Sequence, residues 1–272
     1  MSKEKVKTSN RRVTKWLLWS LALVAVAIGL YLSLFFFPYP LFRHHVDFDG
    51  FDVYSDREIT PDFEFIVEDA RARIERMGVD PRNPGLRIFV CNSQRLFVLI
   101  NRLAGKRHFG QALVISAAGN AFFSVEGIAA IGKRNGGRPV HSRLEGSWSA
   151  AIAHELAHIV IGADPGSPKQ RDIPPWKSEG SADYLANLAA AESDPDYDFV
   201  ARISMLLDDS LWRPPITTFD RRHFRWHVLV EYLCAVQGLS FEELIDPTVE
   251  EDGAWSELKT WYSTRLQAEG ID

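Results

Sequence analysis

The most apolar part of this chain is a continuous run near its start. From Trp16 to Phe37 the sequence WLLWSLALVAVAIGLYLSLFFF holds 22 residues and no charge. A helix of this length, which rises about 1.5 Å per residue, can cross the ~30 Å hydrocarbon core of a bilayer. The run ends in Phe-Phe-Phe-Pro-Tyr-Pro, unlike the small-residue site at which a signal peptide is cleaved. We therefore expect residues 16–37 to be a retained membrane anchor.

The next part of the chain alternates short apolar runs with turn residues, which predicts a small β-sheet. Residues 38–56 are interpreted as a linker that runs into a first strand, and the folded domain is expected to span 57–272. Thr60-Pro61 predicts a helix start, because threonine caps helices and proline is common at their first position. Later strands are expected at 86–92, 111–116 and 121–125, the last two joined by Ala118-Gly119-Asn120.

Helical periodicity dominates the chain after a polar loop at 132–139. Two shorter helices are marked by their caps: Ser93 precedes one that ends near residue 103, and Ser240 with Glu243 forms a capping box. Strands early in the chain and helices late predict an α+β fold. The longer helices are expected at 147–162, 177–191, 197–208, 221–237 and 253–268.

Charge is distributed unevenly along the chain. Residues 1–15 carry six lysines and arginines against Glu4, a charge of +5, so the total of −5 leaves −10 for the rest. The positive-inside rule places such a basic tail in the cytosol, with everything after the anchor on the far side of the membrane. An acidic domain without a basic cluster argues against nucleic acid as a partner. The sequence leaves open whether a second membrane protein binds this one.

The chain has two cysteines, Cys91 in an apolar strand-like run and Cys234 in an apolar helix. Two buried free thiols are the simplest interpretation. A single disulfide is the alternative for a domain outside the cytosol.

The clearest candidate chemistry lies in the helix predicted at 147–162, which contains the sequence HELAH. His154 and His158 are four positions apart and project from the same face, so both imidazoles can reach one tetrahedral ion at about 2.0–2.1 Å. Glu155 lies further round the helix, where it suits a general base better than a ligand. A chance motif on an ordinary helix is the alternative, but buried histidines without a partner would cost free energy.

A third ligand is expected on a neighbouring element, because catalytic zinc sites usually combine three protein ligands with a water. Residues 176–184 read WKSEGSADY and open the next predicted helix. Glu179 is the candidate ligand. Asp183 is four residues later on the same face and could accept a hydrogen bond from the outer nitrogen of a ligating histidine. The alternative for both carboxylates is a solvated helix face.

The pairing of HELAH (154–158) with EGSADY (179–184) resembles the gluzincin metallopeptidases, the thermolysin-like and M1-aminopeptidase-like class. It looks closest to the small peptidase-MA-like domains of that class. The resemblance covers residues 148–190, and more loosely 110–245. A metzincin would require HExxHxxGxxH, and no third histidine occupies that place.

This resemblance implies a domain with a small N-terminal sheet and a mainly helical C-terminal half. It also implies a set of roles: Zn²⁺ held by His154, His158 and Glu179, with Glu155 activating water. Gluzincins further use a tyrosine or histidine to stabilise the oxyanion, and the segment RRHFRWHVLVEYL (221–233) resembles the helix where small members carry that tyrosine. The alignment places His223 there as a catalytic residue, with His227 one turn later as its rival. One well-placed hydrogen-bond donor to the oxyanion stabilises the transition state by about 2.7–4 kcal/mol.

The resemblance implies a membrane-anchored, zinc-dependent peptidase that acts on a peptide or protein substrate. Extended substrate is expected to pair with the strand edge at Asn120–Ser124. No Gly-x-Met-x-Asn amine-recognition motif precedes the metal helix, which favours an endopeptidase. The alternatives are a non-catalytic binding or assembly module at the membrane, and a hydrolase of a non-peptide amide. The sequence contains no GxSxG, Walker A or GxGxxG motif.

Overall fold

The computed structural model describes residues 3–48, 50–76, 85–106, 112–115, 118–128, 147–163, 172–193, 197–211 and 221–270. The chain divides into two compact units, Met1–Leu41 and Phe42–Asp272. The polar loop expected at 132–139 lies outside the described residues.

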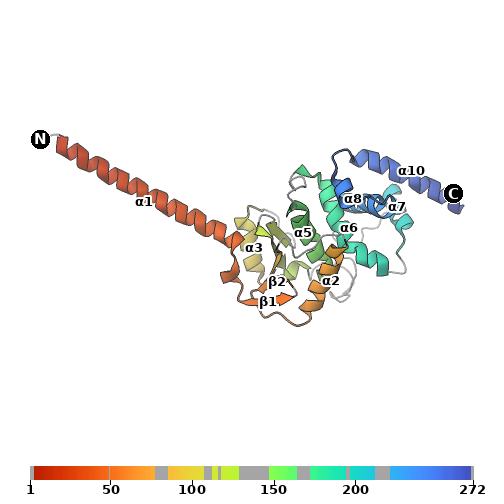
Figure 1. The fold of residues 1–272 in the computed structure, drawn as a ribbon, viewed down its shortest axis with the longest axis horizontal. Coiled ribbons are helices and arrows are strands. Elements are labelled where there is room, and N and C mark those ends of the chain that lie inside the picture. The colour runs from red at the N-terminus through yellow and green to blue at the C-terminus, as the bar shows by residue number, and fades with distance from the viewer. Residues whose placement is uncertain are drawn as a thin grey trace. The chain divides into compact units, whose positions relative to one another are not determined.

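The first unit is a single long helix, α1 (Lys3–Phe36), followed by one short 3₁₀ turn, Tyr39–Leu41 (Figure 1). Its segment Lys15–Phe36 has a mean hydropathy of 2.3 and is long and apolar enough to cross a membrane. The expected apolar helix is therefore present.

The second unit begins with a five-stranded mixed sheet in the order β1-β2-β3-β5-β4. The pairs β2–β3 and β3–β5 are parallel, whereas β1–β2 and β4–β5 are antiparallel. The small N-terminal sheet expected from the sequence is confirmed. The strands are β1 (His44–Phe48), β2 (Phe51–Ser55), β3 (Arg87–Cys91), β4 (Ala112–Ile115) and β5 (Asn120–Ser124).

The assignment of residues 38–56 to a linker is wrong for most of its length. Residues 44–55 form the antiparallel hairpin of β1 and β2, in which Val46 pairs with Val53 and Phe48 with Phe51. Phe51, Val53 and Ser55 are buried while the residues between them are half-buried. This alternation is the period-two signal of a strand with one core face, and the many aspartates around the turn obscured it.

The proposed substrate edge at Asn120–Ser124 is also wrong. β5 lies between β3 and β4 and pairs with both, so its backbone cannot accept a further strand. All five of its residues are buried, as expected for an interior strand. Among the described strands, β4 is the one beside β5 that has a neighbour on one side only.

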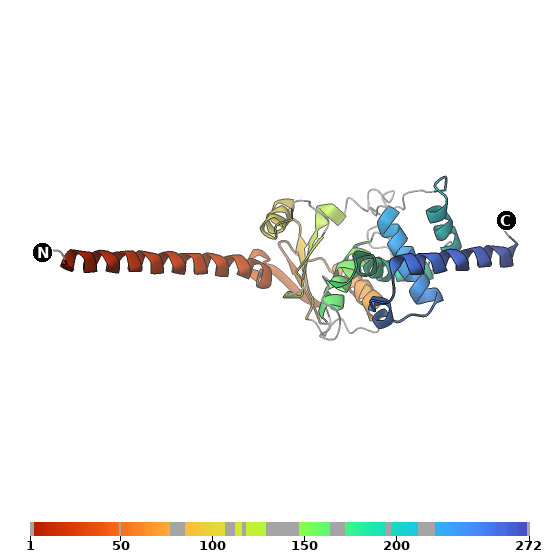
Figure 2. The ribbon, with the colours of Figure 1, turned by 90° about the horizontal axis from the view of Figure 1, so that it is seen from above.

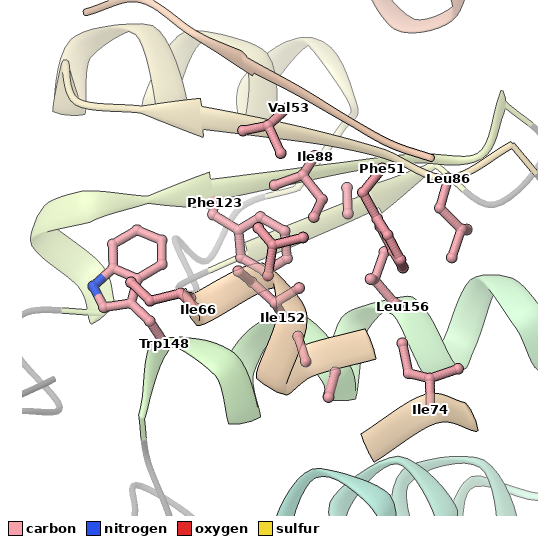
Figure 3. Packing of buried hydrophobic residues seen from close by; sticks show 14 of the residues in the cluster. Phe51, Val53, Ile66, Ile74, Leu86, Ile88, Phe123, Trp148, Ile152 and Leu156 are labelled. Carbon is pink, nitrogen blue, oxygen red and sulfur yellow. The ribbon is translucent and has the colours of Figure 1, made fainter. Parts of the chain in front are cut away.

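The first core fills the space between the sheet and two helices, α2 (Phe63–Glu75) and α5 (Trp148–Ala163). Figure 3 shows Ile88 and Phe123 of the sheet pointing toward Ile152 and Leu156 of α5. Apolar residues on this face fix α5 against the sheet and leave its opposite face for α6. The helix that carries the two histidines is therefore held on both sides.

The C-terminal half is helical, as expected, and the overall α+β class is confirmed (Figure 2). The Ser93 cap of α3 (Gln94–Leu103) and the capping box of Ser240 with Glu243 are both present. A second core joins these helices, and the helix predicted at 221–237 changes to a π-helix in its last turn. The elements are α6 (Pro175–Ser193), α7 (Phe199–Leu207), α8 (Arg221–Glu231), the π-helix (Tyr232–Val236), α9 (Phe241–Ile245) and α10 (Glu251–Glu269).

The crossing of α6 over α8 depends on Gly180. A Cβ atom at this position would lie 2.7 Å from the carbonyl oxygen of Trp226 and 2.8 Å from a methyl carbon of Val230. Both contacts are shorter than van der Waals separation, and the first is to backbone that cannot rotate away. A residue with a side chain would therefore push the two helices apart.

We expect Gly180→Ala to lower the free energy of unfolding by about 1–3 kcal/mol, the usual cost of overpacking a core. Urea unfolding of the detergent-solubilised full-length chain, followed by tryptophan fluorescence, measures this. Gly253→Ala in α10 is the matched control, because open space surrounds that position. Gly253→Ala should leave the free energy of unfolding unchanged or raise it, since alanine is a better helix former than glycine. Equal stability of both variants would contradict the close crossing.

Candidate metal centre

The helix α5 places His154 and His158 side by side on one face. Their Nε2 atoms are 3.3 Å apart, and the two rings meet edge to face with centroids 4.9 Å apart. Both side chains are largely buried. The four-residue spacing predicted this geometry, because it depends only on the local helix.

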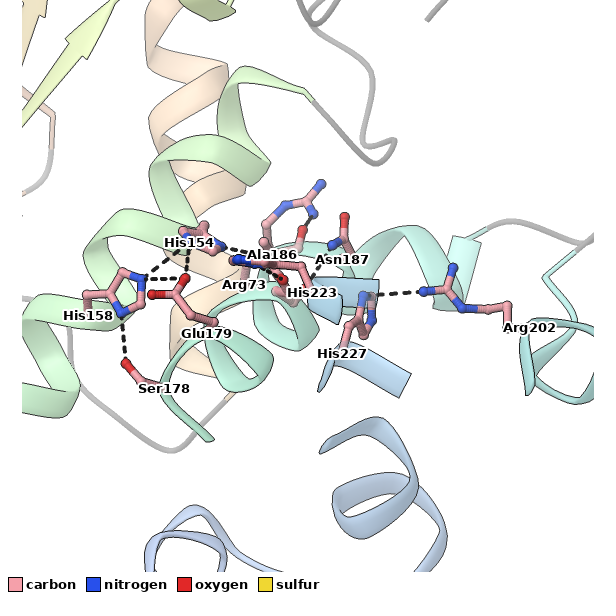
Figure 4. Close-up of polar contacts among 11 residues, drawn as sticks. Arg73, His154, His158, Ser178, Glu179, Ala186, Asn187, Arg202, His223 and His227 are labelled. Atoms are coloured by element: carbon pink, nitrogen blue, oxygen red, sulfur yellow. Dashed lines mark hydrogen bonds and ion pairs between the residues drawn. The ribbon is translucent and has the colours of Figure 1, made fainter. Parts of the chain in front are cut away.

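The helix α6 packs against α5 and brings Glu179 to the two imidazoles. Its Oε2 atom is 3.5 Å from Nε2 of His154 and 3.5 Å from Nε2 of His158 (Figure 4). One potential ligand atom from each of these three residues lies within 4.8 Å of the others. These two imidazole nitrogens and one carboxylate oxygen could hold a metal ion, and the same three ligand types occur in catalytic zinc sites.

Each histidine also has a partner on its outer nitrogen. Asp183, which is fully buried, places Oδ1 2.8 Å from Nδ1 of His154. The hydroxyl of Ser178 is 3.2 Å from Nδ1 of His158. Partners at Nδ1 hold both rings with Nε2 facing the shared centre, as is usual for metal-ligating histidines. The sequence predicted Asp183 as a partner of a histidine Nδ1, but not Ser178. The position of Ser178 directly before Glu179 was the one sequence feature that could have indicated this role.

The charges of the site compensate one another. Burial acts to raise the pKa of the Glu179 carboxyl, but its hydrogen bonds to His154 and His158 outweigh burial and lower it. Burial acts to lower the pKa of His154, but Asp183, followed by Glu179 and Glu155, raises it well above its usual value. The raised pKa of His154 and the lowered pKa of Glu179 favour a charged imidazolium beside a carboxylate, and a cation that bound His154 would displace its proton.

Glu155 follows His154 on α5 and is half-buried. Its negative charge is among those that raise the pKa of His154.

His223 and His227 lie in different surroundings. His223, at the start of α8, places Nδ1 3.7 Å from the second oxygen of Asp183. Together with Glu179 it lines an open pocket of about 560 Å³. Of these two histidines, His223 is therefore the one that shares a cavity with Glu179.

His227 is buried one turn further along α8. Its Nδ1 is 3.3 Å from the Arg202 guanidinium, and its Nε2 is 3.6 Å from the Glu231 carboxylate. Burial, and then the charge of Arg202, lower the pKa of His227 to about 3. A neutral imidazole held inside the helical core does not face the pocket, so the geometry favours His223 as the candidate donor.

A further residue that the sequence did not reveal is Arg73 of α2. Its side chain is fully buried and donates to the Ala186 carbonyl of α6 and, at 2.9 Å, to the Asp69 carboxylate. These bonds fix α2 against α6, the helix that supplies Glu179 and Asp183. A charged residue in an otherwise amphipathic helix gives no sequence signal for such a role.

Cys91 and Cys234 are both free thiols. Burial raises the pKa of Cys234 to about 12 and raises that of Cys91 as well. Neither is a reactive thiolate at neutral pH, so the free-thiol interpretation applies to both.

Protein-family models and curated proteins give no match to this chain. The chemistry of the site is therefore inferred from its own geometry.

Proposed function

We propose that this chain is a membrane-anchored, zinc-dependent peptidase of the gluzincin type. The observation that carries the proposal is the convergence of His154, His158 and Glu179 within 4.8 Å of one another, from two helices. The buried Asp183 behind His154 supports it, because a carboxylate at the outer nitrogen of a ligand is typical of zinc sites. Three ligands that leave one position open suit catalysis rather than a purely structural site.

In this proposal His154, His158 and Glu179 would hold the zinc ion, which when bound would supply Lewis acidity and lower the pKa of a water molecule toward ~7. Glu155 accepts the proton of the attacking water and passes it to the leaving amine. His223 donates a hydrogen bond to the oxygen that becomes negatively charged in the tetrahedral intermediate. Asp183, which faces both His154 and His223, orients the two rings.

The basic residues that precede the apolar part of α1 favour, by the positive-inside rule, an N-terminus in the cytosol and a catalytic domain on the other side of the membrane. Among the described strands, β4 is the edge strand next to β5, and an extended peptide would add there as a further strand. This edge replaces the one expected at Asn120–Ser124.

The proposal is tested with the full-length chain in detergent and a mixture of synthetic peptides. We expect hydrolysis that a chelator abolishes and stoichiometric zinc restores, measured by mass spectrometry of the products. Hydrolysis that persists after complete metal removal would contradict a metal-dependent mechanism. A zinc-loaded chain that hydrolyses no peptide would instead favour the non-catalytic module.

A further inference from the structure

The outward face of α3 combines exposed apolar and basic side chains. Leu99 on this face has 51% of its surface exposed. Arg95 lies four positions before it and Arg102 three positions after it, so the three residues form one stripe along the helix. Both arginines are exposed, as is Lys106, two residues beyond the helix cap. A leucine among basic residues is typical of a helix that lies on a membrane surface.

The opposite face of α3 packs on the sheet. Phe97 and Ile100 are buried, and the side chain of Gln94 accepts a hydrogen bond of 2.7 Å from the Ser124 hydroxyl of β5. The sheet separates α3 from α2 and α5 (Figure 2). The stripe of α3 therefore faces outward on the side of the sheet that is away from the candidate metal centre.

The chain that comes from the anchor enters the domain on this same side of the sheet. Phe42 directly follows the first unit, and the centre of its ring is 5.0 Å from that of Phe89 and 6.2 Å from that of Phe122. Because side chains alternate along a strand, Phe122 shares a face with Ser124, which contacts α3. The anchor is therefore joined covalently to the side of the sheet that α3 covers.

The net charge of the domain conceals a basic segment that contains α3. Residues 81–125 include six lysines and arginines and no aspartate or glutamate, a charge of +6. The charge of −10 on residues 16–272 therefore leaves −16 for the residues outside this segment. An anionic surface would attract the basic segment and repel the rest of the domain.

Charge distinguishes α3 from the other helix with a prominently exposed apolar residue. Phe65 of α2 is 71% exposed, but Glu64 beside it and Glu68 three positions later are exposed as well. Carboxylates around an apolar side chain oppose contact with an anionic surface. The surroundings of Leu99 therefore suit such a surface, and those of Phe65 do not.

We infer that α3 docks on a bilayer that contains anionic phospholipids, with Leu99 in the interface and Arg95 and Arg102 at the phosphates. The inference rests on the anchored part of the proposed function and is independent of the metal centre. The anchor keeps the domain beside the bilayer, so a weak surface contact is sufficient for docking. A nucleic acid would also attract the basic residues, but the exposed leucine and the attachment to the anchor favour lipid.

The experiment measures the surroundings of residue 99 in the full-length chain. Leu99→Cys is labelled with nitrobenzoxadiazole, whose emission shifts to the blue in an apolar medium, and reconstituted into vesicles. Cys91 and Cys234 should not react, because burial raises the pKa of both thiols, and wild-type chain treated in the same way gives the background.

We expect a blue shift in vesicles that contain phosphatidylglycerol and none in vesicles of phosphatidylcholine alone. High salt should reduce the shift, since it screens the attraction between surface charges. Phe65→Cys with the same label is the matched control, because Phe65 is exposed on the other side of the sheet. Its label should report water in both lipid mixtures.

Arg95→Gln combined with Lys106→Gln tests the role of charge. Both side chains are exposed, so the variant should fold. A basic residue at an anionic membrane contributes about fivefold to binding, so loss of two should lower the docking equilibrium about 25-fold. The ratio of docked to undocked chain is measured from the label at residue 99 over a series of phosphatidylglycerol contents. Lys259→Gln with Arg265→Gln, both exposed on α10, removes the same charge elsewhere and should leave this ratio unaltered.

The outcomes separate this inference from the proposed anchor. Extraction of the chain from the vesicles by alkaline carbonate would overturn both. A chain that stays in the vesicles, while its label at residue 99 reports water in both mixtures, would overturn the inference and leave the anchor intact. An equal shift in both mixtures, or unchanged docking of the glutamine variant, would contradict recognition of anionic headgroups. A shift caused by duplex DNA and not by phosphatidylglycerol would assign the surface to nucleic acid instead.

Discussion

The His158→Ala variant is expected to lose its metal. Purified wild-type chain should contain about one zinc per molecule, bound by three protein ligands. The Nε2 atom of His158 is 3.3 Å from that of His154 and 3.5 Å from Oε2 of Glu179, so its removal leaves two ligands on different helices. Loss of a partner behind a ligand costs about 10–100-fold in metal affinity, and loss of the ligand itself should cost more. Elemental analysis after dialysis measures the zinc content.

The same change should reduce stability when zinc is present. A ligand at about 1,000 times its dissociation constant stabilises the native state by about 4.1 kcal/mol, and this contribution depends on ligands from both α5 and α6. The unfolding midpoint of wild-type chain should therefore rise when zinc is added, whereas that of His158→Ala should not. Glu179→Ala should behave in the same way, because it removes the ligand from α6.

His45→Ala is the matched control for the loss of a histidine. His45 lies on β1, is exposed, and pairs with Asp52 at 2.7 Å. This variant should retain full zinc. Wild-type chain that carries no zinc after preparation without chelators would exclude the metal centre and leave a binding or assembly module as the better interpretation.

The Glu155→Gln variant is expected to keep its zinc and lose its turnover. Glutamine has the size of glutamate but cannot accept the proton of an attacking water. A positioned general base contributes about 10²–10⁴-fold to the rate, and we expect a loss in this range. Peptide hydrolysis and zinc content are measured on the same preparation, so that loss of chemistry is distinguished from loss of metal.

Glu68→Gln on the exposed face of α2 is the matched control and should retain full activity. Unchanged hydrolysis in Glu155→Gln would remove Glu155 from the mechanism. Joint loss of activity and zinc would show instead that the carboxylate supports the metal centre, which the proposed role does not require.

Local interactions were readable from the sequence. The face shared by His154 and His158 follows from the helical repeat, and the same repeat places Asp183 above Glu179 on α6. The caps Ser93 and Ser240 were identified because a hydroxyl before a helix satisfies its first backbone N–H groups. The apolar run near the N-terminus and the hairpin of β4 and β5 likewise depend on residues close together in the chain.

Contacts between distant segments required the tertiary structure. The sequence placed residues 38–56 in a linker that runs into a first strand, and only the pairing of Phe51–Ser55 with β1 and β3 shows that this segment is an interior strand. It could not reveal that β5 is interior, because strand order depends on non-local pairing. The structure favours His223 over His227 as the candidate donor, because the first turn of α8 faces Asp183 and the pocket.

The candidate metal centre depends both on local spacing within helices and on contacts between distant segments. The motif HELAH predicted two candidate ligands and the proposed general base, since their spacing is local to one helix. The position of Glu179 at 3.5 Å from both imidazoles depends on how α6 packs between α5 and α8, where Gly180 allows the close approach to Trp226. Residue types at a given spacing determine which ligands are available, but the packing of helices far apart in the sequence determines whether those ligands meet.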